Sequence, residues 1–136
     1  QFSQGVRTFP EHMAPATASN RAATRAWIER SLKGNPPVEP GQTWYGHEAA
    51  FESAMRLQPD LVFLVTDGVL DRREERGGRT VYPLVPYEEF AASLRAFAKQ
   101  TGRSFRVHVV GFEMDGATAA AMRRLASDYG GQVRSF

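Results

Sequence analysis

The sequence contains no cysteine, only two lysines, and no hydrophobic run that approaches the length of a membrane span. Without cysteine the chain forms neither disulfides nor thiolate metal sites, which fits a reducing or an oxidising compartment equally well. The longest apolar segment falls well short of the roughly 20 residues that a transmembrane helix needs. The net charge is only +2 and the arginines are spread along the chain, so composition does not favour a nucleic-acid-binding surface.

What is present fits one globular domain over residues 1–136, with 42% hydrophobic and 24% charged residues. The most informative segment is residues 60–68, where a continuous apolar run ends abruptly in Asp67 and Gly68. Such a run is typical of a strand buried on both faces of a parallel sheet. Ligands in open sheets of this kind bind beyond the carboxyl ends of the strands, so Asp67 becomes a candidate functional residue.

The remaining pattern predicts helices and strands in alternation. Helices are expected from Thr17 or Ser19 to Gly34, from about Ala50 to just before Pro59, from Pro86 to Gly102, and from Ala117 to Gly130. Strands are expected at residues 6–9, 61–65, 105–112 and 132–136, and a polar loop, with room for one helical turn, at residues 68–86. This order predicts an α/β fold, Rossmann-like and doubly wound, with a mostly parallel sheet sandwiched by helices.

One strand of this predicted sheet lacks a neighbour. Three contiguous parallel strands leave residues 61–65 as an unpaired apolar edge, which is an aggregation hazard. We therefore expect that a pairing strand is missing from these residues, and that the chain self-associates through the bare edge.

Two oxygen-bearing side chains lie on loops next to that strand. Thr43 follows Gly41 just before the second helix, and Asp67 follows the strand. A hydroxyl and a carboxylate suit a hard cation such as magnesium, which keeps several waters and needs few protein ligands. The alternative is structural, because Thr43 can start the helix and Asp67 can cap the following turn.

The order and spacing of several segments resemble the von Willebrand factor A (VWA) domain family, in particular its bacterial versions. The segments are Phe2-Ser3 with residues 6–9, Trp27-Ile28, Gly41-Gln42-Thr43, residues 57–68, residues 107–112 and residues 125–132. The resemblance implies a doubly wound sheet with a metal-ion-dependent adhesion site at its upper edge. That site takes an aspartate and two serines from an Asp-x-Ser-x-Ser loop, a threonine from a second loop and an aspartate from a third, and Thr43 and Asp67 match the last two.

The sequence also departs from the family's pattern. It contains no Asp-x-Ser-x-Ser segment, and the first strand, the first helix and most of the second strand of the family would precede Gln1. We therefore expect a domain truncated at its N-terminus that binds magnesium weakly or not at all. Trp44 and Tyr45 are unusually bulky for the second loop, and they form either a partner-binding patch or packing contacts with a helix.

An enzyme is the less favoured alternative. Residues 65–71 look like the Asp-x-Asp-Gly-Val-Leu segment of haloacid-dehalogenase-type phosphatases, whose first aspartate attacks phosphate. Val65 occupies that position here and cannot act as a nucleophile. The three histidines, His12, His47 and His108, lack the spacing of a zinc site, and His108 is expected to be half-buried in a strand.

We therefore expect a protein-binding module rather than an enzyme, without nucleic-acid or membrane partners. In the complete domain, Thr43 and Asp67 would help to hold magnesium, and an acidic side chain of the partner would complete its coordination. The competing hypothesis is a metal-free scaffold whose protein interface consists of Trp44, Tyr45 and residues 72–79. The sequence leaves open whether the domain faces the cytoplasm or the outside.

Overall fold

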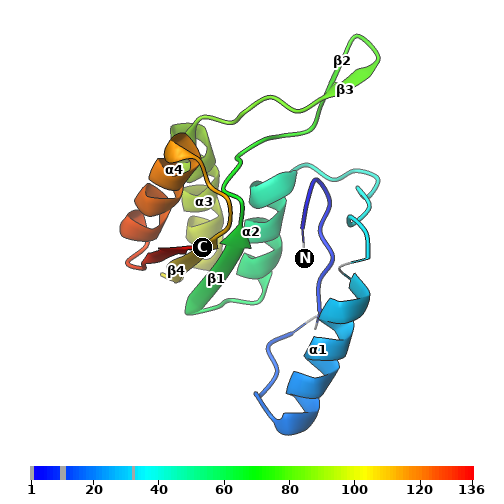
Figure 1. Ribbon diagram of the computed structural model, residues 1–136, viewed down its shortest axis with the longest axis vertical. Coiled ribbons are helices and arrows are strands. Elements are labelled where there is room, and N and C mark those ends of the chain that lie inside the picture. The colour runs from blue at the N-terminus through cyan, green and yellow to red at the C-terminus, as the bar shows by residue number, and fades with distance from the viewer. Residues whose placement is uncertain (1, 10–11, 32) are drawn as a thin grey trace.

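The protein is described by a computed structural model, which places residues 2–9, 12–31 and 33–136 (Figure 1). Its helices are α1 (Ala18–Ser31), α2 (Gly46–Arg56), α3 (Tyr87–Thr101) and α4 (Gly116–Asp128). Its strands are β1 (Leu61–Thr66), β2 (Glu74–Arg76), β3 (Arg79–Val81), β4 (Arg106–Gly111) and β5 (Val133–Ser135). The predicted α/β fold is confirmed as a three-stranded parallel sheet with helices and a small antiparallel hairpin.

The parallel sheet has the order β1-β4-β5. Leu61 pairs with Arg106 at one end of the β1–β4 register and Thr66 with Gly111 at the other, while Val109 pairs with Val133 in β5. In the part of the chain that is described, β1 is therefore an edge strand, as the sequence predicted. Its outer backbone groups lack a neighbouring strand there.

The core lies on one face of this sheet only. Leu64, Val107 and Val109 point into a hydrophobic cluster that is completed by helix residues, including Phe51 and Met55 of α2, Phe90, Leu94 and Phe97 of α3, and Met122 and Leu125 of α4. On the opposite face, Phe63 is 65% exposed and Val65 is 57% exposed. The expectation that residues 61–65 are buried on both faces is therefore wrong, because the described helices cover a single side of the sheet.

Helices α3 and α4 have the ends and the apolar faces that their sequences predict, whereas α2 begins at Gly46, before the expected start near Ala50. In α3, Phe90, Leu94 and Phe97 recur at helical spacing and are buried, and Gly102 ends the helix in the left-handed conformation with φ 65°. Asp115 caps the start of α4, and its Oδ1 accepts a hydrogen bond of 2.7 Å from the Thr118 N–H. These helices fix the positions of β4 and of the loops at its ends.

The N-terminal part differs from expectation at residues 6–9, which do not form a strand. Val6 makes only an isolated antiparallel bridge with Phe2. A turn around Gly5 brings these two residues together, with the Ser3 N–H donating to the Gly5 carbonyl at 3.0 Å. Pro37 lies so close to Gly5 that a Cβ there would be 1.9 Å from the Pro37 carbonyl oxygen.

Helix α1 is confirmed, but its surroundings are not those of a core helix. Thr17 precedes its first residue, and the Thr17 Oγ1 accepts a hydrogen bond of 3.1 Å from the Asn20 N–H. The helix lies at the end of the molecule opposite the hairpin (Figure 1). Trp27 stacks on Phe9 outside the core cluster. Leu32 lies outside the described residues, and Gly34 does not have the positive φ of the left-handed terminator that was expected.

The polar segment at residues 68–86 contains the antiparallel hairpin β2–β3 and not a helical turn. Gly77 and Gly78 connect the strands with φ values of 57° and 75°, the positive values that a two-residue hairpin turn requires. The pairing of Glu74 with Val81 continues in the same register to a bridge between Asp71 and Leu84. Residues 70–85, here called the ribbon, therefore form one two-stranded arm that projects beyond the sheet (Figure 1).

Candidate functional site

The carboxyl end of β1 carries the aspartate that the sequence singled out. Asp67 is exposed, and its Oδ1 accepts a hydrogen bond of 3.1 Å from the Val69 N–H. Gly68 follows with φ 81°, and a Cβ at this position would lie 3.0 to 3.2 Å from Met114, Thr118 and Met122. The Asp67 carboxylate caps the turn after the strand, which is the structural alternative that its sequence allowed.

A buried histidine lies behind this turn. His47, at the start of α2, places its Nε2 2.7 Å from the hydroxyl of Thr66, and that hydroxyl accepts a hydrogen bond from the Gly68 N–H. Phe2 and Phe90 contact the imidazole edge to face. Burial lowers the pKa of His47 to about 4, although the negative charge of Asp67 acts in the opposite direction. The ring is therefore neutral at pH 7 and serves as a hydrogen-bonding part of the core.

The two predicted magnesium ligands lie on separate loops, one before α2 and one after β1. Thr43 is exposed in the loop before α2, and no hydrogen bond links it to Asp67 in the described chain. The described residues also contain no group of three acidic or histidine side chains placed to hold a metal ion. Of the two predicted ligands, Asp67 already accepts a hydrogen bond from the Val69 N–H.

The two aromatic residues before α2, Trp44 and Tyr45, are both partly buried and do not form a fully exposed patch. Trp44 packs edge to face on Phe97 of α3, with ring centroids 5.3 Å apart, and contacts the core cluster. The packing alternative is thus confirmed for Trp44. Tyr45 is half-buried at the residue before α2 and makes no side-chain capping hydrogen bond. A partner-binding role for Tyr45, and for the exposed part of Trp44, stays a prediction.

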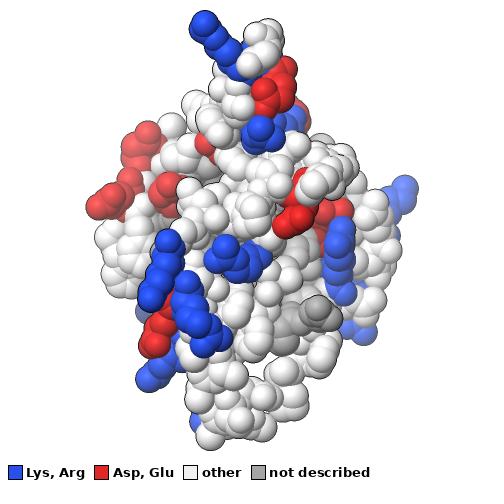
Figure 2. Space-filling model, turned by 90° about the vertical axis from the view of Figure 1, so that its right-hand side faces the viewer, with Lys and Arg blue, Asp and Glu red and all other residues white. Residues whose placement is uncertain are grey.

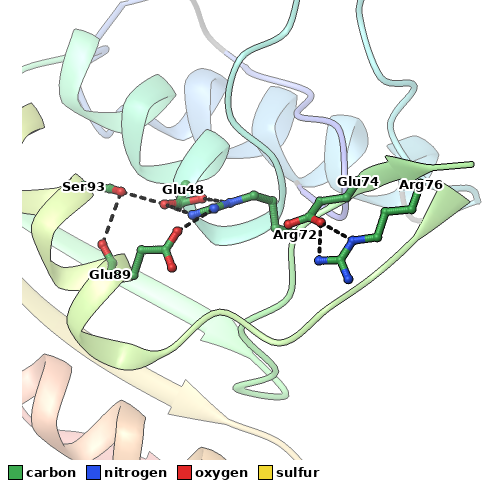
Figure 3. Close-up of polar contacts among 6 residues, drawn as sticks. All are labelled: Glu48, Arg72, Glu74, Arg76, Glu89 and Ser93. Carbon is green, nitrogen blue, oxygen red and sulfur yellow. Dashed lines mark hydrogen bonds and ion pairs between the residues drawn. The ribbon is translucent and has the colours of Figure 1, made fainter.

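An extended set of polar contacts lies at the root of the ribbon (Figure 3). Glu48 of α2 is only 3% exposed and receives two hydrogen bonds of 3.0 Å from the Arg72 guanidinium. Ser93 of α3 donates a third, of 2.6 Å, to Glu48, and Arg72 also donates to Glu89 at 2.6 Å. We call these four residues the Glu48 cluster.

The Glu48 cluster ties three segments together. The two carboxylates raise the pKa of Arg72 above its usual range, chiefly through the hydrogen bond to Glu48, so the guanidinium stays positively charged. A bidentate arginine–carboxylate pair also fixes the relative orientation of its two partners. The first strand of the ribbon is therefore held against α2 and α3 where it leaves the body of the protein.

Sequence reasoning missed this cluster, although a signal was present. Glu48 lies one turn before the buried Phe51 of α2 and two turns before the buried Met55. Ser93 lies among the buried Phe90, Leu94 and Phe97 of α3. Polar residues on two otherwise apolar helix faces indicate a shared buried contact. The cation that joins them comes from a charged stretch that was interpreted as solvated.

The ribbon also exposes apolar side chains near its root, and beyond the root it is stabilised by short-range ion pairs. Arg73 pairs with Glu75 at 2.7 Å and Arg76 with Glu74 at 2.6 Å. Tyr82 and Leu84, two residues apart and hence on the same side of one chain, are 53% and 74% exposed. Figure 2 shows the ribbon as the projection at the top, with acidic and basic side chains next to each other on it. The arm is thus an apolar and mixed-charge surface and not a field of one sign.

Other features give less indication of a site. Two open hollows, of about 360 and 600 Å³, lie beside β5 and at the carboxyl end of α3, away from Asp67 and the ribbon. His108 is half-buried in β4, as expected, and stacks on Phe63. Val65, at the phosphatase nucleophile position, projects from the open face of the sheet.

Comparison of the chain with protein-family models, with curated proteins and with solved structures gives no match. Among the described helices, none combines the length and the apolar character needed to cross a membrane.

Proposed function

We propose that this chain is a protein-binding module of the VWA type, which binds a partner through the ribbon and does not transform a substrate. The observation that carries the proposal is the projecting ribbon, which has an exposed Tyr82 and Leu84 on one side and a buried ion pair at its root. Exposed tyrosine and apolar side chains on a pre-positioned arm are favourable for an interface, because little conformational entropy is lost on binding.

The finer fold assignment belongs to the same proposal. A VWA-type sheet is doubly wound, with further strands beyond the position of β1 and helices on both faces. Two findings support the assignment: β1 is an apolar edge strand, and the residue after it is an aspartate at the carboxyl end of the sheet. Both are where the family resemblance would place them.

The metal contribution in this chain is proposed to be weak. Thr43 and Asp67 supply two oxygens on separate loops, whereas magnesium requires nearly ideal octahedral geometry and gives up its waters reluctantly. A dissociation constant above ~1 mM is expected for two such ligands. In a complete site, Thr43 and Asp67 would hold the ion and an acidic side chain of the partner would complete it.

Site-specific photo-crosslinking tests the proposed interface. A photoreactive amino acid replaces Tyr82 or Leu84 in the ribbon, and, as a matched control, the exposed Gln100 near the carboxyl end of α3. The variants are irradiated in extract of the source cells. We expect one shared partner from positions 82 and 84 and none from position 100, with a yield that is similar in magnesium and in EDTA.

Two outcomes would contradict the proposal. Equal crosslinking from position 100 would show that the ribbon has no special role. The absence of any crosslink from positions 82 and 84 would show that the ribbon is not part of the interface. Isothermal titration with magnesium chloride tests the metal part separately. Saturable binding well below ~1 mM that disappears in Asp67→Ala would show that the two loops form a working metal site.

A further inference from the structure

We propose that the partner adds an extended segment of its chain to the ribbon as a third strand, antiparallel to residues 79–84. This inference rests on the proposed function, and it specifies the mode of binding and the chemistry of the partner. The ribbon lies inside the chain and leaves the sheet at the carboxyl end of β1 (Figure 1). Further strands beside β1 would therefore extend the parallel sheet and leave the ribbon as it is.

Two hydrogen bonds at the root show which backbone groups of the ribbon point outward. The Arg72 N–H donates to the Pro83 carbonyl at 3.1 Å, and the Val85 N–H donates to the Leu70 carbonyl at 2.8 Å. These two bonds flank the antiparallel bridge at Leu84. In such a pair, the N–H and C=O groups of the bridged residue itself point away from the opposite strand.

The outer edge of the second ribbon strand is open to a further strand. Backbone direction alternates along a strand, so the outward N–H and C=O groups belong to Thr80, Tyr82 and Leu84. All three residues are exposed, whereas Asp71 and Arg73 on the opposite edge are half-buried. Among the described residues, no third strand pairs with the hairpin. We call the outward groups of the three exposed residues the ribbon edge.

The proline of the ribbon does not interrupt the ribbon edge. Proline has no N–H, so it prevents strand pairing where its nitrogen faces the neighbouring strand. The Pro83 nitrogen faces inward, toward Arg72, where it removes one hydrogen bond from the ribbon itself. Each outward residue keeps one donor and one acceptor, so roughly six hydrogen bonds to an antiparallel partner strand are available.

Side chains restrict which segment fits. Residues directly opposite each other in a sheet project from the same face, so the partner residues opposite Tyr82 and Leu84 contact these two exposed side chains. Both partner residues are expected to be apolar and to lie two positions apart. Backbone hydrogen bonds then supply affinity and the alternate side chains supply specificity, as in other complexes formed by strand addition.

The tip of the ribbon adds a charge requirement. Arg79 lies directly opposite Arg76, and like charges in this arrangement are unfavourable. Arg76 is compensated by its ion pair with Glu74, but no acidic side chain among the described residues pairs with Arg79. An acidic partner residue opposite Arg79 would compensate it. Read from its N-terminus, the partner segment is therefore expected to be apolar, any, apolar, any, any, acidic.

A synthetic hexapeptide with this pattern, acetyl-Val-Thr-Ile-Thr-Thr-Glu-amide, tests the register by NMR titration up to ~2 mM. Its matched control is the peptide of reversed sequence, whose glutamate reaches Arg79 only in a parallel arrangement. We expect a dissociation constant of about 0.1 to 1 mM, and at least threefold weaker binding of the control. The amide protons of Tyr82 and Leu84 should move downfield as they form hydrogen bonds, and that of Val81 should move little, because it faces inward.

Three results of this titration would overturn the proposal. They are the absence of saturable binding, larger shifts at the inward amide protons than at the ribbon edge, and equally tight binding of the reversed peptide.

Two variants separate strand addition from the side-chain binding on which it rests. Tyr82→Ala removes the ring and keeps the outward N–H, whereas Tyr82→Pro removes both and is compatible with an edge position. With the photoreactive residue at position 84, crosslinking to the partner should be at least about threefold lower in Tyr82→Pro than in Tyr82→Ala. The amide proton of Val85, which bonds across the ribbon to Leu70, reports whether the ribbon stays paired in both variants.

The outcomes for the two proposals differ. Equal crosslinking in Tyr82→Pro and Tyr82→Ala would overturn strand addition and leave the proposed function intact. The absence of crosslinks from the otherwise unaltered ribbon would contradict the proposed function and, with it, this inference.

Discussion

Removing Arg72 should be the most damaging single change to a charged side chain of this protein. In Arg72→Ala, Glu48 stays buried at the contact of α2 and α3 with only the Ser93 hydroxyl as a partner. Breaking a buried ion pair by removing one member typically costs 3–5 kcal/mol. Because the Arg72 side chain is 23% exposed and its loss admits water, we expect a cost near the lower limit, about 3 kcal/mol.

Urea unfolding followed by far-ultraviolet circular dichroism measures the effect. With a slope of about 2 kcal/mol per molar urea, a loss of about 3 kcal/mol lowers the midpoint by roughly 1.5 M. Arg76→Ala is the matched control, because its ion pair with Glu74 is exposed and should contribute less than about 1 kcal/mol. Replacing both Glu48 and Arg72 by methionine should restore much of the lost stability.

The reasoning would be refuted by a midpoint for Arg72→Ala within about 0.3 M of that for Arg76→Ala. It would also fail if the double methionine variant were less stable than Arg72→Ala. In either case the Glu48 cluster would not hold the ribbon to the helices in the way its geometry indicates.

Two further predictions concern the carboxyl end of β1. Gly68→Ala should lower stability by more than Gly77→Ala, since both positions have positive φ but only Gly68 lacks space for a Cβ; equal midpoints in urea would contradict this. His47 has a folded pKa of about 4, below its ordinary 6.5, so the unfolded chain binds the proton first as the pH falls. Stability should thus decrease by about 3 kcal/mol between pH 6.5 and pH 4 and level off below, and His47→Gln should lack this component; unchanged pH dependence in the variant would contradict the assignment.

The elements that sequence alone predicted best are those whose local pattern and tertiary environment agree. In α3 the apolar spacing, the proline at its start and Gly102 at its end all indicate the helix that is found. The run that forms β1, and the aspartate at its carboxyl end, were also placed correctly. In these segments local propensity and packing favour the same structure.

The ribbon was missed because its side chains are charged. Glu74, Glu75 and Arg76 lack the apolar alternation of a half-buried strand, since neither face of β2 enters the core. The remaining signal was Gly77-Gly78 followed by the β-favouring Thr80 and Val81. The pairing itself depends on cross-strand contacts such as that between Glu75 and Thr80, which no single strand reveals.

The open face of the sheet illustrates a different limit. Phe63 and Val65 have the composition of buried residues, and a continuous apolar run gives no indication of which side is covered. Similarly, the Glu48 cluster joins residues up to 45 positions apart. The apolar helix faces around Glu48 and Ser93 indicate that these residues are buried, but they do not show that the two contact each other. Both outcomes depend on how elements are assembled, which lies beyond local periodicity.

The ribbon has a mechanical consequence. The seven residues from its root to the start of its turn span roughly 20 Å, whereas the Arg72–Glu48 contact lies next to the point where the arm leaves the body. A sideways force on the tip acts about 20 Å from the root, whereas the Arg72–Glu48 contact that resists it lies close to the root. The force on this contact therefore exceeds the force at the tip several-fold. Tension applied through a bound partner would reach helices α2 and α3 before it reached the parallel sheet.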